Sequence, residues 1–123
     1  MKVGRRDAGA VSVLSLTGRF AGEPEHRELA AHIAALLAEG RLDVLINLAG
    51  LAWVNSTGLG ALVAAFDAVR RRGGRLKLCA VSDRVDDVLG GCGLYSMFEV
   101  HRTEEAALAS FLSPGGAPGG NRP

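Results

Sequence analysis

The fold class follows from residues 43–60, which read DVLINLAGLAWVNSTGLG. The segment 43–48 is short, nearly continuously apolar and partly β-branched, as expected of a strand that is covered on both faces in a parallel sheet. A loop over residues 49–55 then leads into a helix over residues 56–72. The apolar positions of this helix form one stripe: Leu59, Leu62, Val63, Phe66 and Val69. A strand that leads into an amphipathic helix in this way indicates an α/β domain.

The flanking sequence extends this pattern in both directions. Alternating or short apolar runs predict four further strands, at residues 2–7, 11–17, 75–81 and 98–101, with Gly18 ending the second of them. Helical spacing predicts three further helices, at residues 24–39, at residues 82–89 and from Thr103 onward. The order of these elements predicts a mostly parallel sheet of four or five strands with about four helices beside it.

Length and charge exclude several classes of protein. The chain has 123 residues, and its 14 Lys+Arg and 13 Asp+Glu give a net charge of +1. This near-neutral balance argues against nucleic acid or an acidic membrane as the partner. The low aromatic content of 5% argues against a large aromatic-lined ligand pocket. Because no apolar window of membrane-spanning length and no signal-like start occur, we expect a cytoplasmic protein that does not insert into membranes.

The chain is expected to form one domain over residues 1–112, followed by a disordered tail, rich in Gly and Pro, at residues 113–123. Cys79 and Cys92 are too few for a disulfide scaffold and have no metal-ligand spacing. We therefore expect two buried free thiols and no metal site.

Three consecutive cap-forming residues, Asn55, Ser56 and Thr57, precede the helix that begins at residue 56. One such residue is enough to cap a helix, at about 1 kcal/mol, and capping is one interpretation of the run. In the other interpretation, Ser56 presents an exposed hydroxyl at the positive end of the helix. Free N–H groups and the helix dipole tolerate a phosphate there, so Ser56 is a candidate phosphoacceptor.

Nucleophilic catalysis by Ser56 does not fit the pattern. The motif G-x-S-x-G is absent because Val54 stands at the first glycine position. The three histidines have no acidic partner at a recognisable spacing, and we interpret them as surface or packing residues: His26, His32 and His101. We therefore expect no enzymatic activity.

A nucleotide or nucleic-acid site is not expected either. Gly58 and Gly60 lack the third glycine and the following lysine of nucleotide-binding loops, and they are better explained by close approach to another backbone, within the chain or in a partner. The basic residues 70–72, with Arg75 and Lys77, begin at a helix C-terminus and have no aromatic residues between them. Compensation of the helix dipole explains them better than contact with nucleic acid.

Small side chains surround the apolar stripe of the same helix, at Ala61, Ala64, Ala65 and Ala68. They permit tight packing inside the domain, or they form a flat docking surface next to Ser56. The sequence leaves both interpretations open.

Residues 45–48, 54–62 and 73–78 together resemble the STAS domain and, within it, the bacterial anti-sigma factor antagonists. The likeness extends to Leu16-Thr17-Gly18 and to residues 85–94, so it spans about residues 8–112. It implies a single STAS-like domain. The family usually has Asp where this chain has Asn55, which keeps the capping role without the negative charge.

The resemblance also implies a function. In its unphosphorylated form such a protein binds an anti-sigma factor that is also a serine kinase, and a sigma factor is released for transcription. The kinase phosphorylates the serine that matches Ser56, and a metal-dependent serine phosphatase restores it. Because the kinase holds ATP and magnesium, no cofactor is expected in this chain.

The expected partner-binding residues surround this serine: Asn55, Ser56, Thr57, Gly58, Leu59, Gly60, Ala61 and Ala64. The alternative function is a STAS accessory subunit of a membrane transport complex of the lipid-trafficking ABC type. Such a subunit also needs a docking helix, but it needs no phosphorylated serine.

Overall fold

The computed structural model describes residues 1–91 and 93–112, so Cys92 and the tail expected at residues 113–123 lie outside the described residues. Its strands form one five-stranded sheet, ordered β1 (Lys2–Ala8), β2 (Val11–Phe20), β3 (Asp43–Val54), β4 (Arg75–Cys79) and β5 (Val100–His101). β1 is antiparallel to β2, and all other neighbours are parallel. The mostly parallel sheet is confirmed, and the edge strand near the start makes it five-stranded.

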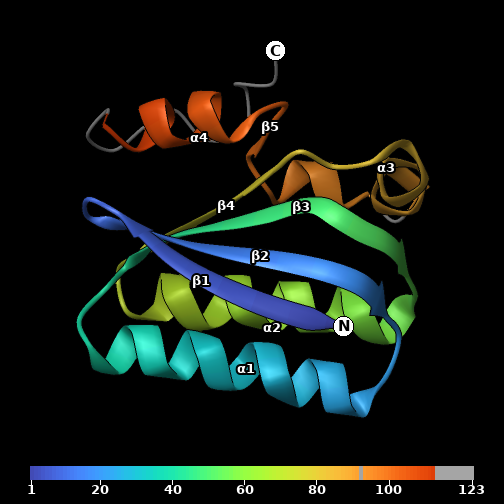
Figure 1. The fold of residues 1–123 in the computed structure, drawn as a ribbon, viewed down its shortest axis with the longest axis horizontal. Coiled ribbons are helices and arrows are strands. Elements are labelled where there is room, and N and C mark those ends of the chain that lie inside the picture. The colour runs from blue at the N-terminus through green and yellow to red at the C-terminus, as the bar shows by residue number, and fades with distance from the viewer. Residues whose placement is uncertain (92, 113–123) are drawn as a thin grey trace.

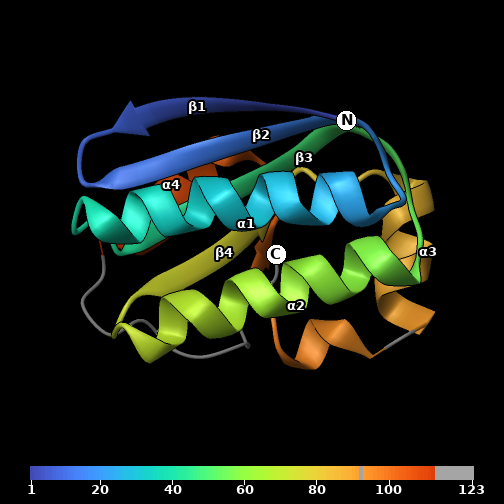
Figure 2. The same cartoon turned by 90° about the horizontal axis from the view of Figure 1, so that it is seen from below.

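The helices are α1 (Glu23–Ala38), α2 (Ser56–Arg71), α3 (Asp83–Gly91) and α4 (Glu104–Phe111), with a short 3₁₀ helix η1 (Leu94–Ser96). α1 and α2 lie side by side on one face of the sheet, and α4 lies on the opposite face (Figure 1). α3 lies at the end of the sheet where α1 and α2 begin (Figure 2). All four predicted helices are therefore present.

Two apolar cores explain why most positions of the central strand β3 are apolar. The larger core lies between the sheet and the α1–α2 layer and includes Leu14, Ile46, Leu62 and Leu78. The smaller core lies under α4 and consists of Val11, Val13, Leu45, Cys79, Ala107 and Phe111. Because successive side chains of a strand point to opposite faces, a strand between two helix layers must be apolar on both.

Two strands are longer than the sequence pattern predicts. The prediction of a loop over residues 49–55 is wrong, because β3 continues to Val54. The predicted end of the second strand at Gly18 is also wrong, because β2 continues to Phe20. The two extensions pair with each other, Gly18 with Leu51 and Phe20 with Val54, across irregularities in register. Each extension supplies the hydrogen-bond partners of the other, which no local pattern reveals. Together they bring the ends of β2 and β3 to the edge from which α1 and α2 start.

The last two strands are shorter than predicted. β4 ends at Cys79 because the next residue, Ala80, adopts a φ of +59°, outside the extended region. β5 is reduced to Val100–His101, which pairs with the end of β4.

Candidate partner-binding site

Asn55 joins the start of α2 to the connection between β2 and α1. Its side-chain Oδ1 accepts a hydrogen bond from the Gly58 amide at 3.1 Å, which caps the helix. Its Nδ2 donates to the carbonyl oxygen of Ala21 at 2.9 Å, and its backbone N–H donates to that of Phe20 at 3.2 Å. The capping role predicted for this position is therefore present, and the amide group also uses its donor.

Ser56 is the first residue of α2, and its side chain is exposed. Within the described part of the chain its hydroxyl has no hydrogen-bond partner. The first intrahelical hydrogen bond of α2 runs from the Leu59 amide to the Asn55 carbonyl oxygen at 2.9 Å, so the amides of Ser56 and Thr57 precede it. No acidic residue lies in the first turn to offset the positive end of the helix dipole. A phosphate on Ser56 would therefore meet unpaired amides and a favourable field.

The eight predicted partner-binding residues divide by exposure. Ser56, Gly60 and Ala64 are exposed, and Asn55 and Thr57 are half-buried. The other three are buried and support the surface from beneath: Gly58, Leu59 and Ala61. The accessible part of the predicted surface is thus a strip along α2 from residue 56 to residue 64.

The two glycines of the first turns of α2 have different surroundings. A Cβ at Gly58 would lie 2.5 Å from the Phe20 carbonyl oxygen and 2.5 Å from Val54 Cγ2. A Cβ at Gly60 would meet nothing within 4 Å. The close backbone approach expected from the sequence is present at Gly58, where it is internal, whereas Gly60 faces open space.

The alanines of α2 mainly serve internal packing. Ala61 and Ala65 are buried, and together with Ala64 and Ala68 they line a small cavity of about 160 Å³ against α1. Small side chains here allow the two helices to approach each other closely. Of the four, only Ala64 is exposed.

Arg19 and Trp53 form a feature of this edge that the sequence analysis missed. They are register partners at the ends of β2 and β3, and the Arg19 guanidinium lies 4.5 Å from the centre of the Trp53 ring. Only the pairing of the two strand extensions brings them together.

A buried polar cluster lies under α4, on the opposite face of the sheet from α2. His101 Nε2 lies 2.6 Å from Glu99 Oε2, and Lys77 Nζ lies 3.0 Å from the same oxygen. His101 therefore has an acidic partner two residues away on its own segment, which the sequence analysis did not recognise. Burial raises the pKa of Glu99, but hydrogen bonds from His101 and Lys77 outweigh this effect and hold it below its usual value.

The thiol of Cys79 is free and fully buried, as expected, and burial raises its pKa to about 12. No group of three or more His, Cys, Asp or Glu side chains within residues 1–91 and 93–112 is arranged to hold a metal ion.

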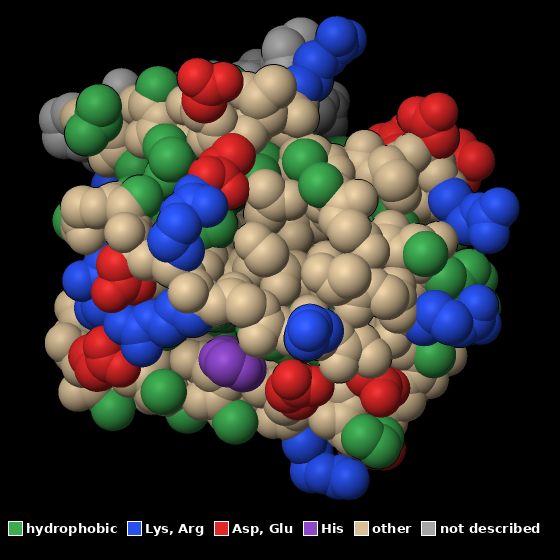
Figure 3. Space-filling view, viewed as in Figure 1, with side chains coloured by type: hydrophobic (Ala, Val, Ile, Leu, Met, Phe, Trp, Pro, Cys, Tyr) green, Lys and Arg blue, Asp and Glu red, His purple; other side chains and the backbone are tan. Residues whose placement is uncertain are grey.

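The basic run at the end of α2 does not form a continuous patch. Arg71 pairs with Asp67, Arg75 pairs with Asp43, and Lys77 is buried. Acidic and basic side chains are also interspersed over the face seen in Figure 3.

A profile of the STAS domain matches residues 8–107. The chain belongs to the STAS family. Two of its curated relatives are named as antagonists of anti-sigma factors. BtrV of Bordetella bronchiseptica, described as an anti-sigma factor antagonist, is 32% identical over 84 residues, which cover 68% of this chain and 72% of BtrV. The anti-sigma-B factor antagonist of Bacillus subtilis is 33% identical over 72 residues, which cover 58% of this chain and 66% of that protein.

Solved STAS structures share the fold. Unphosphorylated SpoIIAA, an anti-sigma factor antagonist, superposes with a TM-score of 0.71 at 18% identity, over 91% of this chain and 99% of SpoIIAA. Its phosphorylated form, from Bacillus, superposes with a TM-score of 0.69 at 20% identity, over 88% and 97% of the two chains. At these identities the likeness concerns the STAS fold alone. Among the described helices of this STAS chain, none combines the length and the hydropathy that a bilayer span requires.

Proposed function

We propose that this chain is a cytoplasmic anti-sigma factor antagonist that binds an anti-sigma factor serine kinase when unphosphorylated and thereby releases a sigma factor. Phosphorylation of Ser56 by that kinase ends the interaction, and a serine phosphatase restores it. The chain itself catalyses no reaction and holds no cofactor, because the kinase supplies the nucleotide and the metal.

The observation that carries this proposal is the presentation of Ser56. Its exposed hydroxyl is unbonded within the described part of the chain, and it lies at the start of a helix that has no acid in its first turn. A kinase needs an accessible hydroxyl, and a helix start accommodates the product phosphate without rearrangement. The names of the curated relatives support the same function.

The switch needs only local electrostatics. A phosphate adds roughly −1.5 to −2 charges at pH 7, which the amides of α2 accept in the free protein but which a docked partner must desolvate. A penalty of about 2.7 kcal/mol would weaken the complex about a hundredfold. No change of fold is required for such a difference.

The test uses the anti-sigma factor kinases encoded in the same genome, purified and mixed singly with the full chain, ATP and Mg²⁺. We expect one kinase to bind the chain and to add a single phosphate, with fragment ions placing it on Ser56 and excluding Thr57. Calorimetry should then give an affinity about a hundredfold weaker for the phosphorylated chain and for Ser56→Asp. Ser15→Ala, which removes a serine hydroxyl from β2, is the control and should be phosphorylated like the parent.

Two results would contradict the proposal. One is a phosphate on another residue, and the other is a kinase that binds the parent and Ser56→Asp equally well. Co-purification with a transporter ATPase, with Ser56 unmodified, would instead favour the accessory subunit of a transport complex.

A further inference from the structure

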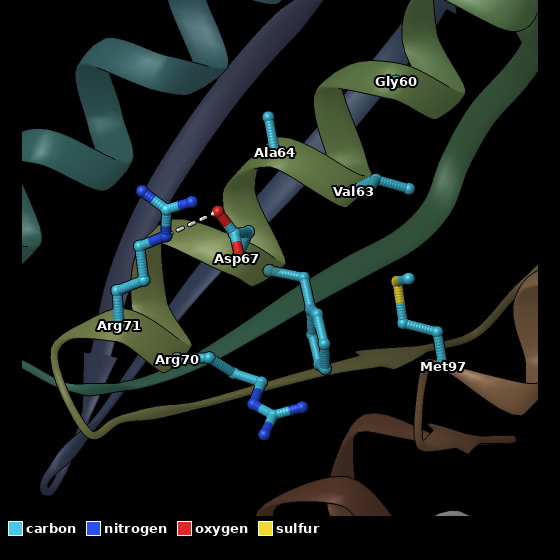
Figure 4. Close-up of a pocket in the computed structure, with 8 residues that line it drawn as sticks. Gly60, Val63, Ala64, Asp67, Arg70, Arg71 and Met97 are labelled. Atoms are coloured by element: carbon cyan, nitrogen blue, oxygen red, sulfur yellow. Dashed lines mark ion pairs between the residues drawn. The ribbon is translucent and has the colours of Figure 1, made fainter.

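A groove of about 600 Å³ runs along the side of α2 that faces away from α1, between this helix and the residue that follows η1. Its lining begins at Gly60, continues through Val63 and Phe66, and ends at Arg71, with Met97 on the opposite side (Figure 4). The lined part of α2 is about 16 Å long, so the groove suits an elongated occupant.

The apolar part of the groove includes an anchored aromatic ring. The Phe66 ring packs edge-on against the buried Phe98 ring, with a centroid distance of 5.1 Å and an interplanar angle of 67°. Met97 is 41% exposed and is one of the two large hydrophobic residues that are exposed in the described part of the chain. Val63 and Met97 face the same opening from opposite sides (Figure 4). An exposed methionine beside an anchored aromatic ring is typical of a surface that binds an apolar side chain.

The charge at the groove identifies the chemistry of its occupant. Asp67 and Arg71 neutralise each other at 2.9 Å. Arg70 lies 5.6 Å from the Phe66 ring centre, and within residues 1–91 and 93–112 no carboxylate lies within ion-pair distance of it. An apolar segment that covered the groove would remove water from the Arg70 guanidinium, at a cost that a carboxylate of the occupant offsets.

The groove continues the surface around Ser56. Gly60 and Ala64 line it and also belong to the exposed strip of predicted partner-binding residues. A protein seated on Ser56 therefore reaches the groove about one helical turn further along α2.

We propose that this groove binds an acidic, amphipathic helix of the partner protein, with apolar side chains between Val63 and Met97 and a carboxylate on Arg70. The proposal rests on the proposed function for the identity of the partner, whereas the chemistry of the groove stands independently of it. The contact would add affinity and specificity that phosphorylation of Ser56 leaves unchanged, because the groove and the phosphoacceptor occupy different parts of α2.

The first experiment tests the chemistry without any kinase. The probe is a helical peptide of about 14 residues with leucines along one side and glutamates beside them, and its match carries lysine at each glutamate position. We expect the glutamate peptide to shift the methyl signals of Val63 and Met97 in NMR spectra and to bind about tenfold more tightly than the lysine peptide.

Charge reversal supplies the controls. Arg70→Glu should reverse the preference, so that the lysine peptide binds more tightly. Arg27→Glu, on the exposed surface of α1, makes the same change in net charge and should keep the preference of the parent. Equal binding of both peptides, no binding of either, or reversal in Arg27→Glu would each overturn the proposal.

The second experiment uses the kinase identified through Ser56. We expect Arg70→Glu and Met97→Asp each to weaken its binding about tenfold, with Arg27→Glu unchanged. If the kinase binds the parent and both groove variants alike, the inference falls and the proposed function stands. If no kinase binds but the glutamate peptide does, the proposed function falls and the groove stands as a site for acidic helices.

Discussion

Replacing Gly58 and Gly60 separately by alanine makes the same chemical change two residues apart, with opposite expected effects on stability. Both lie in the first turns of α2, and neither has a positive φ. Alanine at either position therefore favours the helix by about 0.5–1 kcal/mol, because it restricts the unfolded chain. The difference arises from what the added methyl group meets.

At Gly58 the new Cβ lies 2.5 Å from the Phe20 carbonyl oxygen, which also accepts the Asn55 amide hydrogen bond. The strand end cannot retreat without lengthening that bond, so we expect an overpacking cost of about 1–3 kcal/mol. After the helix gain is subtracted, Gly58→Ala should lose up to about 2.5 kcal/mol of unfolding free energy. The methyl group added in Gly60→Ala meets no neighbouring atom within 4 Å, so this variant should keep the whole gain in unfolding free energy from the helix.

The assay is urea unfolding followed by circular dichroism, with the slope m compared between variants so that a changed unfolded state is recognised. With a urea slope m of about 1–3 kcal/mol/M, each kcal/mol shifts the urea midpoint by about 0.3–1 M. If both variants moved the midpoint in the same direction, or if Gly58→Ala were the more stable, the packing of α2 against the end of β2 would be refuted.

Further predictions concern three side chains. Asn55→Asp should lower the unfolding free energy by about 0.5–2 kcal/mol at pH 7, because the carboxylate cannot donate a hydrogen bond to the Ala21 carbonyl oxygen, although it gains from the helix dipole. The loss should shrink at low pH, where the protonated side chain can donate again. Urea midpoints measured at both pH values check this. The depressed pKa of Glu99 contributes stability that is complete above its ordinary pKa of 4.5 and is lost as the pH falls, so the acid slope of the parent should flatten in Glu99→Gln. The same variant leaves Lys77 buried without its carboxylate and should cost about 3–5 kcal/mol at pH 7, whereas a parent-like midpoint would show that the pair is dispensable. In a Cys92→Ser background, an aromatic disulfide reagent at pH 8 should modify Cys79 only after urea is added, because burial raises its pKa to about 12; rapid labelling of the native protein would contradict this.

The sequence predicts those elements whose signals are local. The apolar stripe and the cap of α2 lie within one segment, and the predicted helix over residues 56–72 matches α2 to within one residue at each end. The sequence does not predict the extensions of β2 and β3, because residues such as Gly18 and Gly50 have low intrinsic strand preference. Only the pairing of the two extensions with each other makes them strands. The position of Ser56 at the helix start could likewise be predicted, whereas the contrast between Gly58 and Gly60 could not, because it depends on the end of another strand.

The groove and the buried cluster were missed for a related reason. Phe66 belongs to the apolar stripe of α2, so its sequence pattern indicates a core position, and its half-exposure depends on how far η1 and Met97 stand from the helix. The spacing of Glu99 and His101 indicates only that both point to one side of a strand. The buried Lys77 of the neighbouring strand makes them a cluster, and no local pattern joins the two.

The contacts of Asn55 bear on how a phosphate could act at Ser56 without unfolding the site. Asn55 uses one end of its amide to cap α2 and the other to hold the Ala21 carbonyl, so the residue before Ser56 fixes the start of α2 against the start of α1. A negative charge at this position would compete with the phosphate for the same helix start. A neutral residue that fixes the backbone leaves the positive end of the helix dipole available to a phosphate on Ser56. The departure from the family's usual Asp is therefore compatible with a phosphorylated serine at position 56, as the proposed function requires.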